Sequence, residues 1–255
     1  MIKRKNAREI ELMRRAGRIA AEARCHAEKM VTVGTTTQSI NDRLHNFIIS
    51  QGAMPVFLGY GGFPASVCIS LNNEVIHVIP TSRKLLEGDI VSIDIGVKKG
   101  GYIGDCAATF IAGTGNAESK RLIEVTRQSF FEGFKFARAG NRVSDISAAI
   151  QKYAEDNGFS VVRDYVGHGV GRDMHEPPNI PNYVERPRKI PNPRLLPGMT
   201  LAIEPMVNMG SFEIRVLADE WTVVTADGKN SAHYENTILI THTDPEILTM
   251  YEGAI

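Results

Sequence analysis

The stretch "GDIVSIDIGVKKGGYIGDCAATFIAG", residues 88–113, predicts two β-strands joined by a tight turn that contains glycine. Apolar residues alternate with small or polar ones along residues 91–97, so the first strand should bury one face and present Asp94 on the other. If the turn is centred at residues 99–100, antiparallel counting places Asp94 directly opposite Asp105. Two facing carboxylates must share a proton or hold a cation between them, and both alternatives stay open at this point.

The same pattern recurs in the second half of the chain. A shift of 110 residues aligns "GDIVSID" with "GMTLAIE", so that Glu204 takes the position of Asp94. Glu235 begins "ENTILIT" much as Asp105 begins "DCAATFI", and a shift of 106 residues aligns several glycines and apolar residues of the preceding segments. We therefore predict an α+β fold in which helix, helix and strands are repeated, with an antiparallel sheet covered by helices and a site between the halves.

Helical periodicity predicts the remaining elements. Asn6 and Glu9 form a capping-box pattern, and apolar residues then recur with helical spacing to about Lys29. A second helix is predicted in "TTTQSINDRLHNFIISQG", and two more near residues 117–137 and 144–156. The segment "EPPNIPNYVERPRKIPNPRLLPG" contains seven of the twelve prolines, so an extended surface loop is predicted there.

Charge and hydropathy exclude several classes of protein. Lys plus Arg equals Asp plus Glu, at 29 each, so net charge indicates no nucleic acid or anionic membrane partner. The charged N-terminal segment does not resemble a signal peptide, and no run of apolar residues is long enough for a membrane helix, which predicts a soluble cytoplasmic protein. Cys25, Cys68 and Cys106 lie far apart and are interpreted as reduced thiols.

Two histidines lie in the glycine-rich segment "GHGVGRDMHEPP". The glycines disfavour a helix, and an odd spacing would place His168 and His175 on opposite faces of a strand, so a loop is predicted to bring them together. Four carboxylates from two related hairpins would repel one another unless divalent cations, two for charge balance, lie between them. With one imidazole added, these oxygen and nitrogen ligands suit manganese, iron, cobalt or zinc without selecting among them.

The order Asp94, Asp105, His168, Glu204 and Glu235 resembles the five metal ligands of the methionine aminopeptidase family, a "pita-bread" metallopeptidase family (M24). The segments "GHGVGRDMHEPP", "PGMTLAIEPM", "SAHYENTILIT" and "YGGFPASVCISLNNEVIHVIP" resemble that family's motifs, and the bacterial type I form is the most similar. The resemblance implies one pita-bread catalytic domain over residues 1–255, with pseudo-two-fold repeats at about residues 7–115 and 116–245.

The resemblance implies a role for each ligand. Asp94 would bind one divalent ion, His168 and Glu204 the other, and Asp105 and Glu235 would bridge both. A water molecule activated by the two ions would attack the peptide bond, and Glu204 would also carry a proton to the leaving amine.

Two catalytic histidines and a methionine pocket are also implied. His175 would stabilise the scissile carbonyl oxygen, and His77 would contact the substrate's backbone nitrogen. Substrate contacts are expected from Tyr60, Phe63, Cys68, His77, His175 and Trp221. Three positions that depart from the common family pattern affect the pocket's shape: Phe57, Val78 and Met174. Four histidines match no family position and are interpreted as surface or structural residues: His26, His45, His233 and His242.

The implied activity is co-translational removal of the N-terminal methionine from nascent proteins and peptides, with preference for a small second residue. Nascent N-termini would be the partners, and a monomer is expected. Basic residues of the proline-rich segment form a hypothetical contact with the ribosome surface: Arg186, Arg188, Lys189 and Arg194.

Three other functions are compatible with parts of the pattern. An X-Pro aminopeptidase would share the fold but usually carries a large additional N-terminal domain. A catalytically silent pita-bread binding protein would be expected to lose metal ligands, and all five are present. A metal-dependent phosphoesterase also uses carboxylates and histidine. Cleavage of Met-Ala-Ser but not of Ala-Pro-Ala would separate these alternatives.

Overall fold

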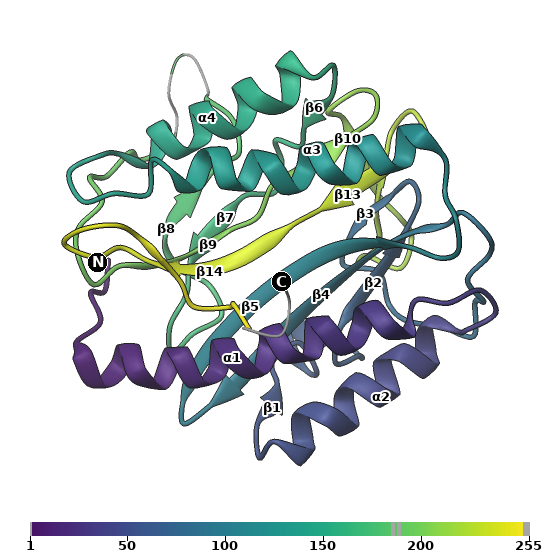
Figure 1. Ribbon diagram of the computed structural model, residues 1–255, viewed down its shortest axis with the longest axis horizontal. Helices are drawn as coiled ribbons and strands as arrows, with labels where there is room; N and C mark the ends of the chain where they lie inside the picture. The colour runs from purple at the N-terminus through teal and green to yellow at the C-terminus, as the bar shows by residue number, and fades with distance from the viewer. Residues whose placement is uncertain (1, 185–186, 188–189, 252–255) are drawn as a thin grey trace.

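The computed structural model describes residues 2–184, 187 and 190–251. A central sheet of nine strands runs through the molecule, and two pairs of helices cover it (Figure 1). The helices are α1 (Ala7–Met30), α2 (Thr37–Ser50), α3 (Ala117–Phe134) and α4 (Val143–Asp156), together with the short 3₁₀ turn η1 (Tyr60–Gly62). The predicted helices are confirmed, including the capping box in which Asn6 and Glu9 each accept a hydrogen bond from the other's backbone N–H.

The central sheet has the strand order β1-β4-β5-β14-β9-β7-β8, and β2 and β15 pair with β4 and β14 respectively. Its strands are β1 (Met54–Pro55), β2 (Cys68–Leu71), β4 (Ile90–Lys99), β5 (Tyr102–Ile111), β7 (Gly167–Gly169), β8 (Glu176–Ile180), β9 (Thr200–Ile203), β14 (Glu235–Leu239) and β15 (Glu246–Ile247). Two sheets of three strands complete the fold: β6 (Ser160–Val161), β10 (Met206–Asn208) and β13 (Ser231–His233) form one, and β3 (Glu74–Ile76), β11 (Ile214–Val216) and β12 (Val223–Thr225) the other.

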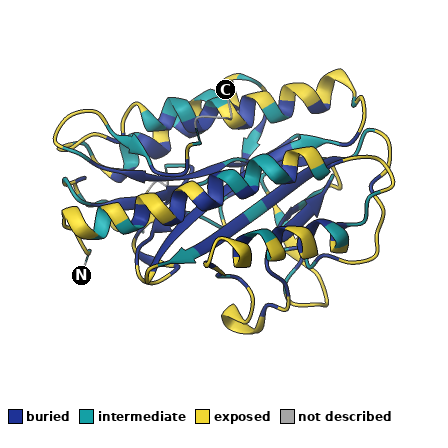
Figure 2. Cartoon of the chain, turned by 60° about the horizontal axis from the view of Figure 1, so that its bottom comes forward, coloured by how far each residue is buried: buried dark blue, intermediate teal, exposed yellow. Residues whose placement is uncertain are grey.

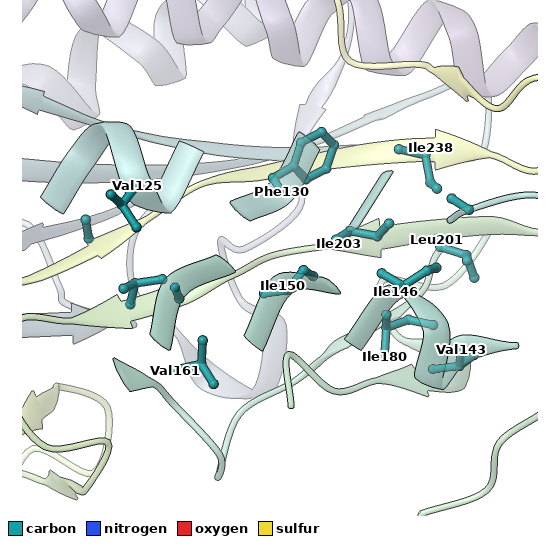
Figure 3. Close-up of a cluster of buried hydrophobic side chains, with 14 of the residues drawn as sticks. Val125, Phe130, Val143, Ile146, Ile150, Val161, Ile180, Leu201, Ile203 and Ile238 are labelled. Carbon is teal, nitrogen blue, oxygen red and sulfur yellow. The ribbon is translucent and has the colours of Figure 1, made fainter. Parts of the chain in front are cut away.

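Each helix pair packs on its own half of the sheet. Alternate residues of β4 face α1 and α2, and Figure 2 shows the strands buried while the helices expose one side. In the other half, Phe130 of α3 and Ile150 of α4 meet Ile203 and Ile238 of β9 and β14 (Figure 3). Because these residues fill one face of the sheet, the alternating residues of the same strands are free to build a site on the opposite face.

The order of elements in the two halves agrees with the predicted α+β class: two helices precede sheet strands in each. The sheet passes from the first half to the second between β5 and β14. The repeat limits at about residues 7–115 and 116–245 stay a prediction.

The register of β4 and β5 differs from the predicted one. Asp94 pairs with Ala107, and Asp105 pairs with Gly96, so the two aspartates are diagonal neighbours on one face and not directly opposed. The turn is centred on Gly100 and Gly101, whose φ values are 59° and 85°. A two-residue turn that needs φ > 0 at both positions favours Gly-Gly over Lys-Gly, which moves the register by two residues.

The histidine and proline-rich segments contain more regular structure than predicted. His168 lies on β7, and β8 begins directly after His175, so the two imidazoles come from a strand and the loop that follows it. The predicted loop is wrong for Glu176–Ile180, which pairs with β7 as the last strand of the sheet. Prolines are tolerated there because an edge strand needs only one row of backbone hydrogen bonds.

No helix in the described part of the chain is long and apolar enough to cross a membrane.

Candidate metal centre and active site

Five neighbouring strands of the central sheet contribute one predicted ligand each. Sheet order brings together Asp94 (β4), Asp105 (β5), Glu235 (β14), Glu204 (directly after β9) and His168 (β7). Pairing fixes their alignment, because Asp94 and Glu235 lie opposite the same residue of β5, Ala107. Residues two apart on a strand share a face, so Asp105 and Ala107 both face away from the helices.

The side chains of this carboxylate cluster lie close together. Ligand atoms of Asp105, His168 and Glu235 lie within 4.8 Å of one another. His168 Nε2 is 3.5 Å from Glu204 Oε1 and 3.7 Å from Asp105 Oδ2. Asp105, His168 and Glu235 are buried, while Asp94 and Glu204 are half-buried. The structure therefore brings all five predicted ligands into one cluster.

Burial dominates the electrostatics of this cluster. It raises the pKa of Asp105 to about 7, although a hydrogen bond with Glu235 opposes the effect. Burial, reinforced by the charge of Asp105, raises the pKa of Asp94, Glu204 and Glu235 well above the usual carboxyl range. The pKa of His168 falls to about 3, first because of burial and then because of His175, so its imidazole is neutral. Without a cation, the cluster therefore retains protons that a cation would displace.

Buried polar atoms without a hydrogen-bond partner indicate whether the cluster suits a metal ion. Within the described residues, Asp94 Oδ1, Asp105 Oδ1 and Glu235 Oε1 are buried without a hydrogen-bond partner. Leaving such oxygens unpaired is costly unless a cation lies against them. His168 Nδ1 is 2.9 Å from the backbone oxygen of Gly169, which places the proton on Nδ1 and leaves the Nε2 lone pair directed at the carboxylates. The donor set therefore fits divalent cations.

A cavity of about 150 Å³ opens directly beside the cluster. Its walls include all the residues predicted to contact substrate, namely Tyr60, Phe63, Cys68, His77, His175 and Trp221. Phe63 and Trp221 pack edge to face with ring centroids 5.2 Å apart, and Cys68 pairs with Asp94 in the β2–β4 ladder. The walls thus combine aromatic and sulfur-containing groups on one side with the carboxylates on the other.

The two predicted catalytic histidines lie at different depths in this cavity. His175 is exposed, and its ring centroid lies 4.3 Å from that of His168. His77 is half-buried, packs edge to face against Tyr165, and has a φ of 60°, which is uncommon for a residue other than glycine. Burial lowers the pKa of His77 to about 4 and lowers the pKa of His175, so both are neutral near pH 7.

Two of the three departures from the family pattern line the cavity. Phe57 and Met174 are among its wall residues, whereas Val78 is buried outside the wall. A Cβ at Gly96 would lie only 2.7 Å from the Phe57 ring, so the bulky Phe57 relies on the glycine of β4 for its space.

Sequence analysis missed His233. It is 2% exposed, which makes a surface role wrong, and its Nε2 lies 3.8 Å from Glu204 Oε2 and 4.0 Å from Glu235 Oε2. Alternation within one strand could not have found it, because His233 ends β13 of one sheet and Glu235 begins β14 of another. The other three unassigned histidines lie away from the cluster: His26 packs on Phe47, His45 bonds Ser66, and His242 is exposed.

Comparison with known proteins places this fold and site in a class. Residues 11–242 match the model of metallopeptidase family M24. The chain belongs to this family, and it is a metal-dependent hydrolase with the pita-bread fold.

The chain is similar to proteins named methionine aminopeptidase. It is 53% identical to that of Clostridium perfringens over 98% of this chain and 99% of the relative. It is 52% identical to methionine aminopeptidase 1 of Bacillus subtilis, with the same coverage. The crystal structure of methionine aminopeptidase from Rickettsia prowazekii superposes with a TM-score of 0.94 and 42% identity, covering 98% and 100% of the two chains. A prolidase from Pyrococcus furiosus, at 22% identity and a TM-score of 0.79, shares the fold over 66% of its length.

Proposed function

We propose that this chain hydrolyses the first peptide bond of proteins and peptides that begin with methionine, using two divalent cations held by its carboxylate cluster. The single observation that carries the proposal is the cluster itself: four buried or half-buried carboxyl groups and one neutral imidazole, with orphaned oxygens, beside a cavity of aromatic and sulfur-containing walls. The relatives that cover the whole chain support the same activity.

The ligands proposed for the cations are Asp94, Asp105, His168, Glu204 and Glu235, with Asp105 and Glu235 bridging the two. Divalent cations bound there supply Lewis acidity that polarises a carbonyl and activates a water molecule. Asp105 and Glu235 are the most central and the most buried carboxylates, which suits the bridging role. The oxygen and nitrogen donors suit manganese, iron, cobalt and zinc alike, so the proposal covers all four metals.

The remaining residues of the cavity take part in binding and proton transfer. Glu204 lies beside His168 and is half-buried, so it is placed to carry a proton from the attacking water to the leaving amine. His175 would donate a hydrogen bond to the scissile carbonyl oxygen, and His77 would meet the substrate's backbone nitrogen. The proposed methionine pocket is formed by Tyr60, Phe63, Cys68 and Trp221, since soft and aromatic groups suit a thioether.

The activity is tested with two peptides and two metals. Metal-free protein is incubated with Met-Ala-Ser or Ala-Pro-Ala in the presence of cobalt or manganese, and released amino acids are separated by chromatography. Release of methionine only from the first peptide is expected. Cleavage of Ala-Pro-Ala would favour an X-Pro peptidase, and cleavage of neither peptide would favour a binding protein.

The roles of Asp105 and His175 are separated by two substitutions. Asp105→Asn should lose at least one equivalent of manganese in a calorimetric titration, and its turnover should fall by about 100-fold or more, because ligand loss should cost at least as much as loss of an outer partner. His175→Asn should keep both metal equivalents but lose about 10²- to 10³-fold in kcat, as expected for a lost donor to the developing oxyanion. Asp156→Asn, on the exposed side of α4, is the matched control.

The proposal also covers where the enzyme acts and which chains it acts on. We infer a monomeric cytoplasmic enzyme that acts on nascent chains during translation, with a small second residue preferred, and that touches the ribosome through the basic proline-rich segment. Arg186, Arg188 and Lys189 lie outside the described residues, while Arg194 is exposed and donates to the backbone oxygen of Gly140. Reversing these four charges should abolish co-sedimentation with ribosomes at low salt, and unchanged co-sedimentation would refute the contact.

A further inference from the structure

Tyr60 makes a contact that its proposed place in the methionine pocket does not require. Its hydroxyl oxygen lies 2.6 Å from His175 Nδ1, and the two ring centroids are 5.4 Å apart. Tyr60 is 45% exposed, so its ring lies at the rim of the cavity and its hydroxyl points at the proposed catalytic imidazole. This hydrogen bond joins η1 to the loop before β8, which is 115 residues away in the chain.

The chemistry of the two groups favours one direction for this hydrogen bond. A neutral imidazole carries its proton on one nitrogen and accepts a hydrogen bond on the other, and the Tyr60 hydroxyl faces Nδ1 of His175. Within the described residues the Tyr60 hydroxyl has no other hydrogen-bond partner, so donation to His175 Nδ1 satisfies its proton. If Tyr60 donates to Nδ1, the imidazole proton must lie on Nε2.

The backbone of η1 holds Tyr60 in a defined position. Gly59, Gly61 and Gly62 have φ values of 84°, 57° and 93°, a region that side-chain-bearing residues rarely adopt. The turn is closed by hydrogen bonds from the Gly59 N–H to the Phe63 oxygen and from the Phe63 N–H to the Tyr60 oxygen. Phe63 in turn packs against Trp221 in the wall of the cavity. Glycines on both sides of Tyr60 therefore build a turn that presents this one side chain to His175.

We propose that Tyr60 is a positioning residue for His175: its hydroxyl donates to Nδ1, keeps the imidazole proton on Nε2, and so directs an N–H donor at the scissile carbonyl oxygen. This inference rests on the proposed function, because it assumes that His175 contacts the substrate. It assigns the Tyr60 hydroxyl a role distinct from that of the pocket wall. The aromatic ring can contact a substrate side chain without a hydroxyl, whereas the hydrogen bond that biases the tautomer of His175 comes from the hydroxyl.

Tyr60→Phe tests the inference because it removes one oxygen atom and keeps the ring. With manganese-loaded protein and Met-Ala-Ser, kcat should fall roughly tenfold while KM changes little, because one hydrogen bond that orients the donor is lost. Tyr153→Phe on α4, at a residue that does not line the cavity, is the matched control and should behave as the parent does. A rise in KM at constant kcat would show Tyr60 to be a pocket wall only and would overturn the proposal.

A spectroscopic measurement separates this inference from the proposed function. In metal-free protein labelled with ¹⁵N-histidine, two-bond ¹⁵N–¹H correlations report which imidazole nitrogen carries the proton, and His175→Asn identifies the signal. The parent should show His175 protonated on Nε2, and Tyr60→Phe should show a mixture of tautomers. An unchanged tautomer would overturn the role of Tyr60 even where the parent releases methionine normally. Failure of the parent to release methionine would instead count against the proposed function and leave the tautomer result interpretable.

Discussion

At the scale of single residues, His233 is a buried side chain outside the five proposed ligands that lies near the carboxyl groups of two of them, Glu204 and Glu235. Its backbone N–H and C=O both bond the hydroxyl of Thr109, which holds the residue against β5. Its Nε2 has no hydrogen-bond partner within the described residues although it lies near two carboxylates. Burial lowers the pKa of His233 to about 3, so the neutral ring can donate one N–H without adding charge. We expect this N–H to orient Glu204 and Glu235.

Replacement of His233 should therefore weaken metal binding without removing a ligand. His233→Leu should lower manganese affinity by roughly 10- to 100-fold, the usual effect of losing a partner that orients a ligand. His233→Gln retains an N–H donor and should stay closer to the parent, and His45→Gln serves as a control on a histidine that bonds Ser66 instead. Isothermal titration with manganese measures the effect. Equal affinity for the parent and a folded His233→Leu protein would refute the role.

Sequence analysis named the five proposed ligands and the two catalytic candidates but not His233, for a physical reason. Carboxylates and histidines at matching strand positions stand out because buried charge is rare. A single histidine in "SAHYENT" carries no such signal, because only the tertiary structure shows that the end of β13 lies beside Glu204 and Glu235. The Tyr60 hydrogen bond was equally invisible, because it joins side chains from distant segments.

At the scale of elements, glycines decide how the first hairpin packs. Gly104 of β5 lies against α1, where a Cβ would approach the backbone of Gly17 to 2.5 Å. Gly101 has a φ of 85° in the hairpin turn, but a Cβ there would meet open space. The first glycine is needed for close approach of a helix to the sheet, and the second for backbone conformation alone.

Replacement of Gly101 and of Gly104 by alanine should lower the free energy of unfolding by different amounts. Gly101→Ala should lower the free energy of unfolding by about 1–2 kcal/mol, the cost of a left-handed residue with a side chain. Gly104→Ala should cost about 3 kcal/mol or more, because helix and strand must separate to relieve the overlap. Urea denaturation of both variants measures the difference. A Gly104→Ala protein no less stable than Gly101→Ala would contradict the close contact.

A buried ion pair joins the N-terminal segment to the residue that follows His175. Lys5 Nζ lies 2.6 Å from Glu176 Oε2, and their side chains are only 5% and 2% exposed. The Lys5 N–H donates to the oxygen of Gly198, and Glu176 also accepts from the Arg172 N–H. Since Glu176 directly follows His175, this buried ion pair anchors one end of the loop that carries His175.

Removing only one member of the Lys5–Glu176 ion pair should lower the free energy of unfolding more than removing both charges. Lys5→Met removes the buried partner of Glu176 and leaves only the largely exposed Lys3, whose Nζ lies 3.7 Å from Glu176 Oε1, so it should destabilise the protein by up to about 3–5 kcal/mol. The double variant Lys5→Met/Glu176→Gln should recover most of that loss, because no unpaired charge remains. Denaturant titration of the two single variants and the double variant provides the cycle. Additive losses would show that the two residues are not coupled.

At the scale of the whole molecule, the proposed metal centre joins the two halves of the sheet. Asp94 and Asp105 come from β4 and β5, while His168, Glu204 and Glu235 come from the second half. A cation bound by both groups would link the two halves of the central sheet, which pair with each other through β5 and β14. Metal binding should therefore stabilise the entire fold.

The pH dependence of stability provides a test with a defined sign. The carboxyl groups of the cluster have pKa values raised by burial, so the metal-free folded protein holds protons that the unfolded chain releases. Stability must then fall as pH rises through these values. Buried histidines such as His168, with a pKa of about 3, act in the opposite direction, but only below the unfolded histidine pKa near 6.5. In the window from pH 7 to 9 the carboxyl groups dominate up to about pH 8, and towards pH 9 the buried thiols of Cys68 and Cys106, whose pKa values burial also raises, add a decline of the same sign.

In that window we expect the free energy of unfolding of chelator-treated protein to fall, by up to about 1.4 kcal/mol per pH unit for each proton that the folded state retains. Manganese at about 100 times its dissociation constant should add about 2.7 kcal/mol of stability and flatten the decline. Urea denaturation at pH 7, 8 and 9, with and without manganese, measures both effects, and Asp105→Asn should reduce the slope. Stability that rises with pH in metal-free protein would contradict the raised pKa values.

The amino-acid sequence by itself determined the helices, the alternation of the strands, the repeated order of elements and the set of candidate ligands. These features follow from local periodicity, capping and residue chemistry, which act over a few neighbouring residues. Only the tertiary structure decided the diagonal placement of Asp94 and Asp105, the strand at Glu176–Ile180, the burial of His233 and the contact between Tyr60 and His175. Strand register and side-chain contacts between distant segments depend on turn geometry and on tertiary packing, which short-range sequence patterns do not specify.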